Sequence, residues 1–330
     1  MKTLDMNHAP LLQVTDLHKH YAPPRRWLGK TRAPVQAVNG VSFSIRRGET
    51  LALVGESGCG KTTTAKSVMR LVEPTSGSVR LEGTELLSLD AQAMRQRRKD
   101  LQIIFQDPYA SLSPRMSAGE IVAEPLRSFG VGSKTERRDR VDALFARVGL
   151  RPEATAKYPS EFSGGQRQRI GIARALALGP RLIVCDEPVS ALDVSVQAQV
   201  INLLMDLQEE MGLAYLFVAH DLAVVRHISH RVAVMYLGQI VEMGAREAIF
   251  SAPAHPYTEV LLSAAPDPRP GTAREVRLLR GDPPSPANPP SGCRFHTRCP
   301  MAEEVCSTHA PPLSTRGSAD SERWVACHFR

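Results

Sequence analysis

The chain has 330 residues, of which 42% are hydrophobic and 23% charged, so it can bury a sizeable core and wholesale disorder is excluded. Its longest uninterrupted apolar stretch, Leu213 to Ala219, is far shorter than the roughly 18 residues of a membrane-spanning helix. The formal charge of +7 is scattered, and the basic clusters at 94–100 and 133–140 contain no aromatic residue, which argues against nucleic-acid binding. The first residues, MKTLDMNHAP, lack the apolar core of a signal peptide, so we expect a cytoplasmic protein.

Proline usage divides the chain near Pro253, because the 80 residues from 251 onward hold 13 of the 25 prolines. Before this point, strand-like runs at 50–54, 181–185, 215–219 and 232–236 alternate with helical patterns, which predicts an α/β fold with a parallel sheet covered by helices. After it come a short helical pattern, HPYTEVLLSA, a proline-rich connector, GDPPSPANPP, and a cysteine-dense segment. We therefore expect one domain over 1–252 and an extension over 253–330.

The segment GESGCGKT, from Gly55 to Thr62, has the complete pattern of a phosphate-binding loop, and it lies between an apolar strand and a helical pattern as such a loop requires. The glycines let backbone N–H groups surround phosphate oxygens, Lys61 adds a charge near the β and γ phosphates, and the Thr62 hydroxyl reaches Mg²⁺. A dinucleotide site fits less well, because the glycines run GxxGxG and the lysine would have no role. The residues predicted to bind ATP here are Gly55, Glu56, Ser57, Gly58, Cys59, Gly60, Lys61, Thr62 and Thr63.

The segment EFSGGQRQRIGIARALAL predicts a helix that begins with a capping box. Ser163 and Gln166 occupy the two ends of the S-x-x-Q pattern, with Gly164 and Gly165 between them, and the apolar residues that follow form one helix face. A helix start with two glycines and a serine hydroxyl is typical of an anion-binding site, although a box of this kind also serves simply to cap its helix.

The segment RLIVCDEP predicts a buried strand that carries two acidic residues to the edge of the sheet, where ligands collect in open parallel sheets. Asp186 is placed to hold the Mg²⁺ shell, and Glu187 is placed to polarise the attacking water as a general base. Strand alternation would turn the two side chains in different directions.

Together these segments resemble the ATP-binding-cassette (ABC) family, whose signature motif is LSGGQ and whose nucleotide lies between two cassettes. The resemblance implies an ABC-type ATPase with a helical subdomain over 1–252 and assigns four further residues. Tyr21 resembles the aromatic residue that stacks on adenine, and Gln106 in IIFQDPY resembles the lid glutamine that touches Mg²⁺ and water. Asp193 in SALD resembles the residue that acts across the dimer, and His220 after AYLFVA resembles the switch histidine that senses the γ-phosphate. The cap from Ser163 to Gln166 would then face the phosphate loop of the partner cassette, so that ATP joins the dimer and its hydrolysis releases it.

Longer stretches resemble the ATPase subunits of bacterial dipeptide and oligopeptide import permeases, and the second of their two ATPase subunits in particular. These stretches include FQDPYASLSPRM, CDEPVSALDVSVQAQV, HPYTEVLLSA and CRFHTRCP. The resemblance implies a second ATPase subunit, two transmembrane permease subunits, an external substrate-binding protein, and a peripheral position on the cytoplasmic side of the membrane. Peptides are the expected substrate, with nickel, glutathione and opines as alternatives. A soluble, non-transport ABC ATPase is a further alternative, and a redox sensor in the tail is compatible with transport.

Four of the six cysteines fall near the end of the chain, at Cys293, Cys299, Cys306 and Cys327. In a cytoplasmic protein such a cluster favours a metal over disulfides, and four thiolates suit zinc and a four-iron cluster equally. Three histidines could compete as ligands, and four cysteines without metal remain an alternative. Resemblance to peptide-permease ATPases favours a four-iron, four-sulfur cluster.

Overall fold

The computed structural model describes residues 9–22, 33–107, 109–264, 281–315 and 323–330. The chain divides into two compact units: unit 1 contains Met1–Ile45, Thr50–Ser88 and Ala219–Arg330, and unit 2 contains Arg46–Glu49 and Leu89–Val218. Residues 1–8, on which the expected lack of a signal peptide depends, lie outside the described part. The division between 252 and 253 that the sequence suggests stays a prediction.

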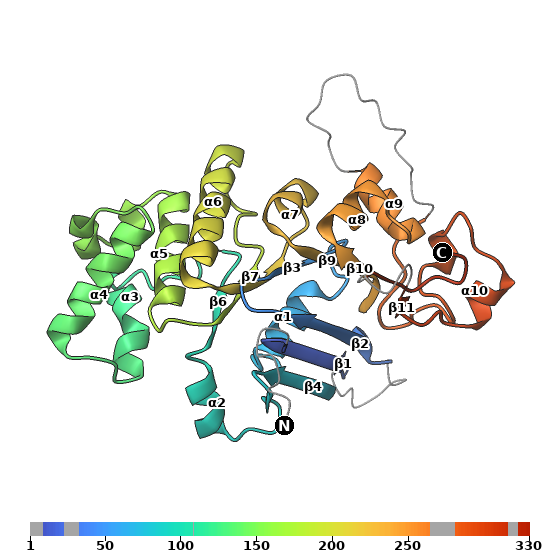
Figure 1. Cartoon of the computed structure of the whole chain (residues 1–330), viewed down its shortest axis with the longest axis horizontal. Helices are drawn as coiled ribbons and strands as arrows, with labels where there is room; N and C mark the ends of the chain where they lie inside the picture. The colour runs from blue at the N-terminus through green and yellow to red at the C-terminus, as the bar shows by residue number, and fades with distance from the viewer. Residues whose placement is uncertain (1–8, 23–32, 108, 265–280, 316–322) are drawn as a thin grey trace, which may run out of the picture. The chain divides into compact units, whose positions relative to one another are not determined.

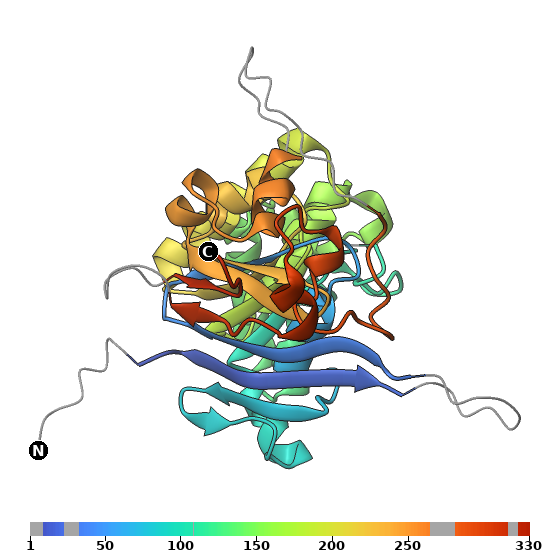
Figure 2. The same cartoon turned by 90° about the vertical axis from the view of Figure 1, so that its right-hand side faces the viewer.

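Unit 1 contains a four-stranded antiparallel sheet. Its strands follow the order β2 (Val35–Ile45), β1 (Leu12–Tyr21), β4 (Ser76–Leu81) and β5 (Thr84–Glu85). Strands β1 and β2 are the long blue pair in Figure 2, antiparallel from Leu12 opposite Ile45 to Tyr21 opposite Val35, with shifts of register between Val14 and His20. Apolar residues of β1 such as Leu12 and Val14 are buried while their neighbours are exposed, as expected for strands with one face on the core.

A second set of strands in unit 1 carries the first predicted site. Its order is β11 (Ser314–Thr315), β12 (Trp324–Val325), β10 (Gln239–Ala245), β9 (Arg231–Tyr236) and β3 (Thr50–Val54). Strands β3 and β9 are parallel and buried along their length, which confirms the strands predicted at 50–54 and 232–236. The short strands β11 and β12 come from the end of the chain, and the sequence patterns did not predict them.

The helices of unit 1 alternate with these strands along the chain or follow them. They are α1 (Lys61–Val68), α7 (Leu222–Ile228), α8 (Arg246–Ser251), α9 (Pro256–Ser263), the 3₁₀ turn η3 (His296–Arg298) and α10 (Glu304–Thr308). Helices α8 and α9 are the orange helices of Figure 1. Helix α9 confirms the helical pattern HPYTEVLLSA, and it begins with Pro256 at its first position, where the missing N–H has no helical partner to lose.

Unit 2 combines a parallel sheet with a group of helices. The strand order is β8 (Ala214–Val218), β7 (Leu182–Asp186) and β6 (Leu101–Ile104), and neighbouring strands are parallel. Strands β7 and β8 are buried throughout, so the α/β fold predicted from the sequence is confirmed. The helical elements are α2 (Ala91–Arg97), α3 (Ala118–Ser128), α4 (Lys134–Arg147), η1 (Pro152–Ala156), η2 (Pro159–Glu161), α5 (Gly164–Leu176) and α6 (Val194–Met211).

Three of these helices form a cluster within unit 2, in which α3 packs against both α4 and α5 (green in Figure 1). Helices α3 and α4 each begin with a complete capping box, formed by a serine and a glutamate three residues apart. Across the described ranges of both units, no helix has the length and apolar character needed to cross a membrane.

Candidate functional site

The predicted phosphate loop lies in unit 1, between β3 and α1. Gly55 has φ of 150° and Gly60 has φ of 110°, values that L side chains rarely adopt. A Cβ atom at Gly55 would lie 2.3 Å from the carbonyl oxygen of Met235, and one at Gly60 would lie 2.2 Å from that of Ala37. Glycine is therefore required at both positions, because the loop backbone is packed directly against neighbouring backbone.

The side chain of Lys61 turns back into this loop. Its Nζ atom donates hydrogen bonds to the carbonyl oxygens of Gly55 at 2.8 Å and Glu56 at 3.0 Å, and the residue is 5% exposed. Gly60 is the N-cap of α1, so the first amides of that helix are directed toward the same loop. Burial raises the pKa of the Cys59 thiol, against the effect of the nearby Lys61 charge, so Cys59 is neutral at pH 7. The loop thus combines a fixed cation with a helix N-terminus, which is the chemistry that binds phosphate.

The two predicted acidic residues lie at the end of β7 in unit 2. Asp186 is the last residue of the strand and is 3% exposed. Glu187 follows in a left-handed backbone conformation with φ of 48°, which is energetically costly for any residue other than glycine. The sequence did not predict this conformation. Its carboxylate accepts a hydrogen bond of 3.0 Å from Nε2 of Gln106, the residue predicted as the lid glutamine. Unit 2 therefore brings the predicted base and the predicted lid residue into contact.

The capping box at the start of α5 is confirmed. The backbone N–H of Gln166 donates to the Ser163 hydroxyl at 3.3 Å, and the Gln166 side chain accepts from the Ser163 backbone N–H at 3.0 Å. Both residues are exposed, and the Ser163 hydroxyl still has its own proton to donate to a ligand. A Cβ at Gly165 would lie 2.4 Å from Cγ1 of Val196, so the second glycine allows α5 to pack closely on α6.

Comparisons with known proteins agree with this geometry. The family model described as "ABC transporter" matches residues 38–190, and the model described as "Oligopeptide/dipeptide transporter, C-terminal region" matches residues 241–306. The chain is 56% identical over 321 residues to the probable peptide ABC transporter ATP-binding protein y4tS of Sinorhizobium fredii, covering 97% of this chain and 90% of that protein. The chain belongs to the ABC transporter ATP-binding proteins. It is therefore an ABC ATPase.

Two further relatives support the same family. The oligopeptide transport ATP-binding protein AppF of Bacillus subtilis is 50% identical and covers 98% of both chains, and OppF of Salmonella typhimurium is 54% identical and covers 92% of both. Among solved structures, a dimeric post-hydrolysis state of the ATP-binding cassette MJ0796 bound to ADP and Pi matches 71% of this chain and 98% of that one, with a TM-score of 0.63 and 30% identity. The predicted ABC fold is thus confirmed.

Of three further residues that the resemblance assigned, two lie at the ends of elements and His220 lies between β8 and α7. Tyr21 ends β1 in unit 1 and is 40% exposed, with the Lys19 ammonium 4.9 Å from the centre of its ring. His220 is exposed and also belongs to unit 1, whereas Asp193 is the N-cap of α6 in unit 2. Their roles in nucleotide binding stay predictions.

The cysteines separate into two groups. Cys59 and Cys185 are buried in the phosphate loop and in β7. The four near the end of the chain, Cys293, Cys299, Cys306 and Cys327, all line one small cavity of about 20 Å³. Burial, followed by the proximity of the other three thiols, raises the pKa of Cys293 to about 11. As these side chains are placed, the described residues contain no group of three or more histidine, cysteine or acidic side chains arranged to hold a metal ion.

Two residues that contact the phosphate loop escaped the sequence analysis. The hydroxyl of Tyr257 accepts a hydrogen bond from the backbone N–H of Glu56, 201 positions away, and the guanidinium of Arg298 pairs with the Glu56 carboxylate across 242 positions. Both residues lie in stretches that resemble the peptide-permease ATPases, HPYTEVLLSA and CRFHTRCP, but nothing in those stretches indicated that they contact the loop.

Proposed function

We propose that this ABC ATPase is the ATP-hydrolysing subunit of an importer for dipeptides and oligopeptides. The observation that carries the proposal is the match over nearly the whole chain to relatives named for peptide transport, together with the oligopeptide/dipeptide transporter region at 241–306. The cassette alone would support any ABC transporter, because the phosphate loop and signature are common to the family. The C-terminal region is what narrows the substrate class to peptides.

In the proposed mechanism the nucleotide phosphates bind the loop that contains Lys61. Thr62, Gln106 and Asp186 would hold Mg²⁺, which would neutralise the developing charge on the phosphates. Glu187 takes the proton of the attacking water, and Gln106, which donates to Glu187 at 3.0 Å, orients the carboxylate for that transfer. The left-handed backbone at Glu187 fixes this carboxylate at the end of β7, where the strain is consistent with a functional position.

The signature cap of one cassette completes the ATP site of another. Ser163, Gly164, Gly165 and Gln166 would contact the γ-phosphate of ATP held by the partner cassette, Asp193 would act across the same interface, and His220 would sense the γ-phosphate. Support comes from the exposure of Ser163 and Gln166 and from the related cassette MJ0796, whose post-hydrolysis structure with ADP and Pi is dimeric. Tyr21 would stack on the adenine.

The proposed assembly contains a second ATPase subunit, two transmembrane permease subunits and an external substrate-binding protein. The chain would lie on the cytoplasmic face of the membrane, bound to the permease subunits. Affinity purification of the tagged chain from membranes tests this arrangement. We expect two polytopic membrane proteins and a second cassette to co-purify, whereas co-purification with ribosomes or DNA would refute it.

The substrate is tested by uptake into cells that contain or lack the gene for this chain. A panel of labelled dipeptides and oligopeptides, Ni²⁺, glutathione and an opine separates the proposed substrate from its alternatives. We expect uptake of peptides to depend on the chain and to be lost in the Glu187→Gln strain. Dependence of nickel, glutathione or opine uptake alone would refute the peptide assignment while leaving the ATPase intact.

We also propose that Cys293, Cys299, Cys306 and Cys327 bind a thiolate metal centre, with a four-iron, four-sulfur cluster as the expected form. The proposal is supported by the cavity that all four line. That cavity, at about 20 Å³, has room for one small atom, so a four-iron cluster requires the thiols to move apart. The centre would stabilise a segment with little apolar core of its own.

Metal analysis of protein purified without oxygen tests this centre. We expect brown protein with about four irons per chain, and loss of the colour in Cys299→Ser. About one zinc per chain and a colourless solution would show that the four cysteines bind a structural zinc ion instead of the cluster. Protein without either metal would refute both forms.

A further inference from the structure

Glu56, the second residue of the phosphate loop, is held through three different groups within unit 1. Its carboxylate accepts hydrogen bonds from Arg298, with Oε2 3.0 Å from Nη1 and Oε1 3.3 Å from Nη2. Its backbone N–H donates to the hydroxyl of Tyr257 at 2.9 Å, and its carbonyl oxygen accepts from Lys61 at 3.0 Å. Two of these three contacts come from residues beyond position 252, so the extension fixes the loop directly.

The carboxylate of Glu56 presents an electrostatic problem at this position. It lies in the loop that receives the phosphates of ATP, and a negative charge there repels them. The side chain of Glu56 is 28% exposed and that of Arg298 is 7% exposed, so the pair is only partly screened by water. Arg298 therefore neutralises a charge that would otherwise oppose nucleotide binding.

The segment that carries Arg298 is firmly attached to unit 1. Arg298 ends the turn η3, directly before Cys299, and its Nη1 atom is 3.4 Å from the hydroxyl of Tyr236 on β9. Phe295, in the same segment, packs on Tyr236 with ring centres 5.2 Å apart and on Tyr257 with ring centres 5.4 Å apart. The aromatic contacts hold the segment beside the strand that flanks the phosphate loop.

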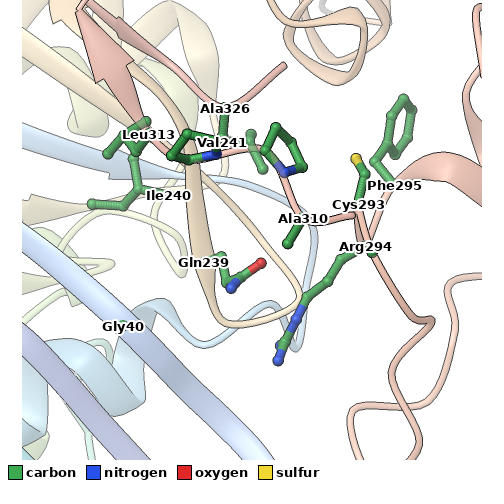
Figure 3. A pocket seen from close by; sticks show the side chains of 13 residues that line it. Gly40, Gln239, Ile240, Val241, Cys293, Arg294, Phe295, Ala310, Leu313 and Ala326 are labelled. Atoms are coloured by element: carbon green, nitrogen blue, oxygen red, sulfur yellow. The ribbon is translucent and has the colours of Figure 1, made fainter. Parts of the chain in front are cut away.

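A second contact leads from the same segment to the loop. Arg294 and Phe295 leave the chain in opposite directions (Figure 3), and Arg294 donates to the carbonyl oxygen of Leu237 in the turn between β9 and β10. The next residue of that turn, Gly238, donates its backbone N–H to the carbonyl oxygen of Cys59 at 2.8 Å. The segment from 293 to 299 thus reaches the phosphate loop both directly and through this turn.

We propose that Arg298 is a positioning residue for ATP binding, which neutralises Glu56 and fixes the phosphate loop from the cysteine-bearing segment 293–299. This inference rests on ATP binding at the loop, and it requires no particular metal in the tail. The coupling between segment 293–299 and ATP binding is reciprocal, because a segment that improves ATP binding must itself be stabilised when ATP binds.

Isothermal titration of the full chain with Mg-ATP tests the charge argument through a double-mutant cycle. We expect Arg298→Met to weaken ATP binding by about tenfold, because it leaves the Glu56 charge unpaired. Glu56→Gln completes the cycle, and the double variant, which lacks the unpaired charge, should bind ATP at least about threefold more tightly than Arg298→Met alone. Arg298→Lys, which keeps a positive charge, should restore most of the affinity, and added salt should reduce the Arg298→Met defect.

The ATPase rate of the assembled transporter separates positioning from general damage. Arg298→Met should raise the KM for ATP while kcat at saturating ATP stays within about twofold of wild type. The matched control is Arg330→Ala, because Arg330 pairs with Glu259 at 3.3 Å in the same part of the chain without contacting the loop. This control should bind ATP like wild type.

Wild-type affinity in Arg298→Met, or a double variant as weak as Arg298→Met, would overturn the proposal. If Arg298→Met does not fold, hydrogen–deuterium exchange of the wild-type chain decides, since ATP should slow exchange in the peptide that covers 293–299, and unchanged exchange would overturn the proposal. Lys61→Ala distinguishes failure of the Arg298 proposal from failure of the phosphate-loop assignment. If Lys61→Ala also binds ATP like wild type, the phosphate-loop assignment itself is wrong.

Discussion

The buried ion pair between Glu242 and Arg323 predicts how strongly the end of the chain stabilises unit 1. Glu242 lies on β10 with a side chain that is 0% exposed, and it accepts from Nη2 of Arg323 at 2.6 Å and from Nε at 3.2 Å. The same carboxylate also accepts from the backbone N–H groups of Ala254 at 2.9 Å and His255 at 2.8 Å. Substituting Arg323 by Met leaves this buried carboxylate with only the two backbone donors.

Removal of one partner of a buried ion pair costs about 3 to 5 kcal/mol, because the remaining charge is uncompensated. Arg323 is 18% exposed and two backbone donors remain, so we expect Arg323→Met to lower the free energy of unfolding by about 3 kcal/mol, the lower end of that range. The corresponding fall in melting temperature is about 6 to 12 °C for a folded unit of this size.

Urea denaturation followed by circular dichroism measures this change. The double variant Arg323→Met, Glu242→Gln should recover at least half of the loss, because it removes the buried charge as well. Arg246→Met is the matched control, since Arg246 and Glu247 form an exposed pair whose loss should cost less than about 1 kcal/mol. A loss below about 1 kcal/mol in Arg323→Met would refute the assigned role of this pair.

Three further outcomes are expected. Glu187→Gln should bind ATP but release phosphate at least about 100-fold more slowly, since it keeps the shape of the base without its proton affinity; turnover at the wild-type rate would show that another group is the base. Ser163→Arg should leave ATP binding by the isolated chain unchanged and block ATPase activity in the assembled transporter, and weakened binding by the isolated chain would contradict the shared site. Burial lowers the pKa of His255 to about 4, so the neutral ring is favoured in the folded state and the free energy of unfolding should fall between pH 6.5 and 4, by about 3 kcal/mol at most. Urea titrations should show that His255→Gln loses this part of the pH dependence, and an unchanged dependence would contradict it.

Local patterns in the sequence predicted the elements whose structure is determined locally. The strand at 50–54 and the capping box of Ser163 are confirmed because apolar runs and cap spacing specify them within a few residues. The left-handed backbone of Glu187 was not predictable, since the residue type disfavours that conformation and only the surrounding fold imposes it. The pairing of Arg298 with Glu56 was equally hidden, because ion pairs across 242 positions follow no spacing rule.

The extension acts on the phosphate loop by two routes that experiments can separate. Strand β12 pairs with β10, β10 with β9 and β9 with β3, and β3 leads into the loop, so Arg323 supports the loop through the strands. Arg298 instead contacts Glu56 in the loop itself. Because a strand contact contributes to the whole unit while a loop contact contributes to one local conformation, Arg323→Met should lower stability with little effect on ATP affinity well below its melting temperature. Arg298→Met should lower ATP affinity even at a temperature where the variant is fully folded, and equal loss of affinity in both variants at that temperature would show that the extension acts on the loop only through overall stability.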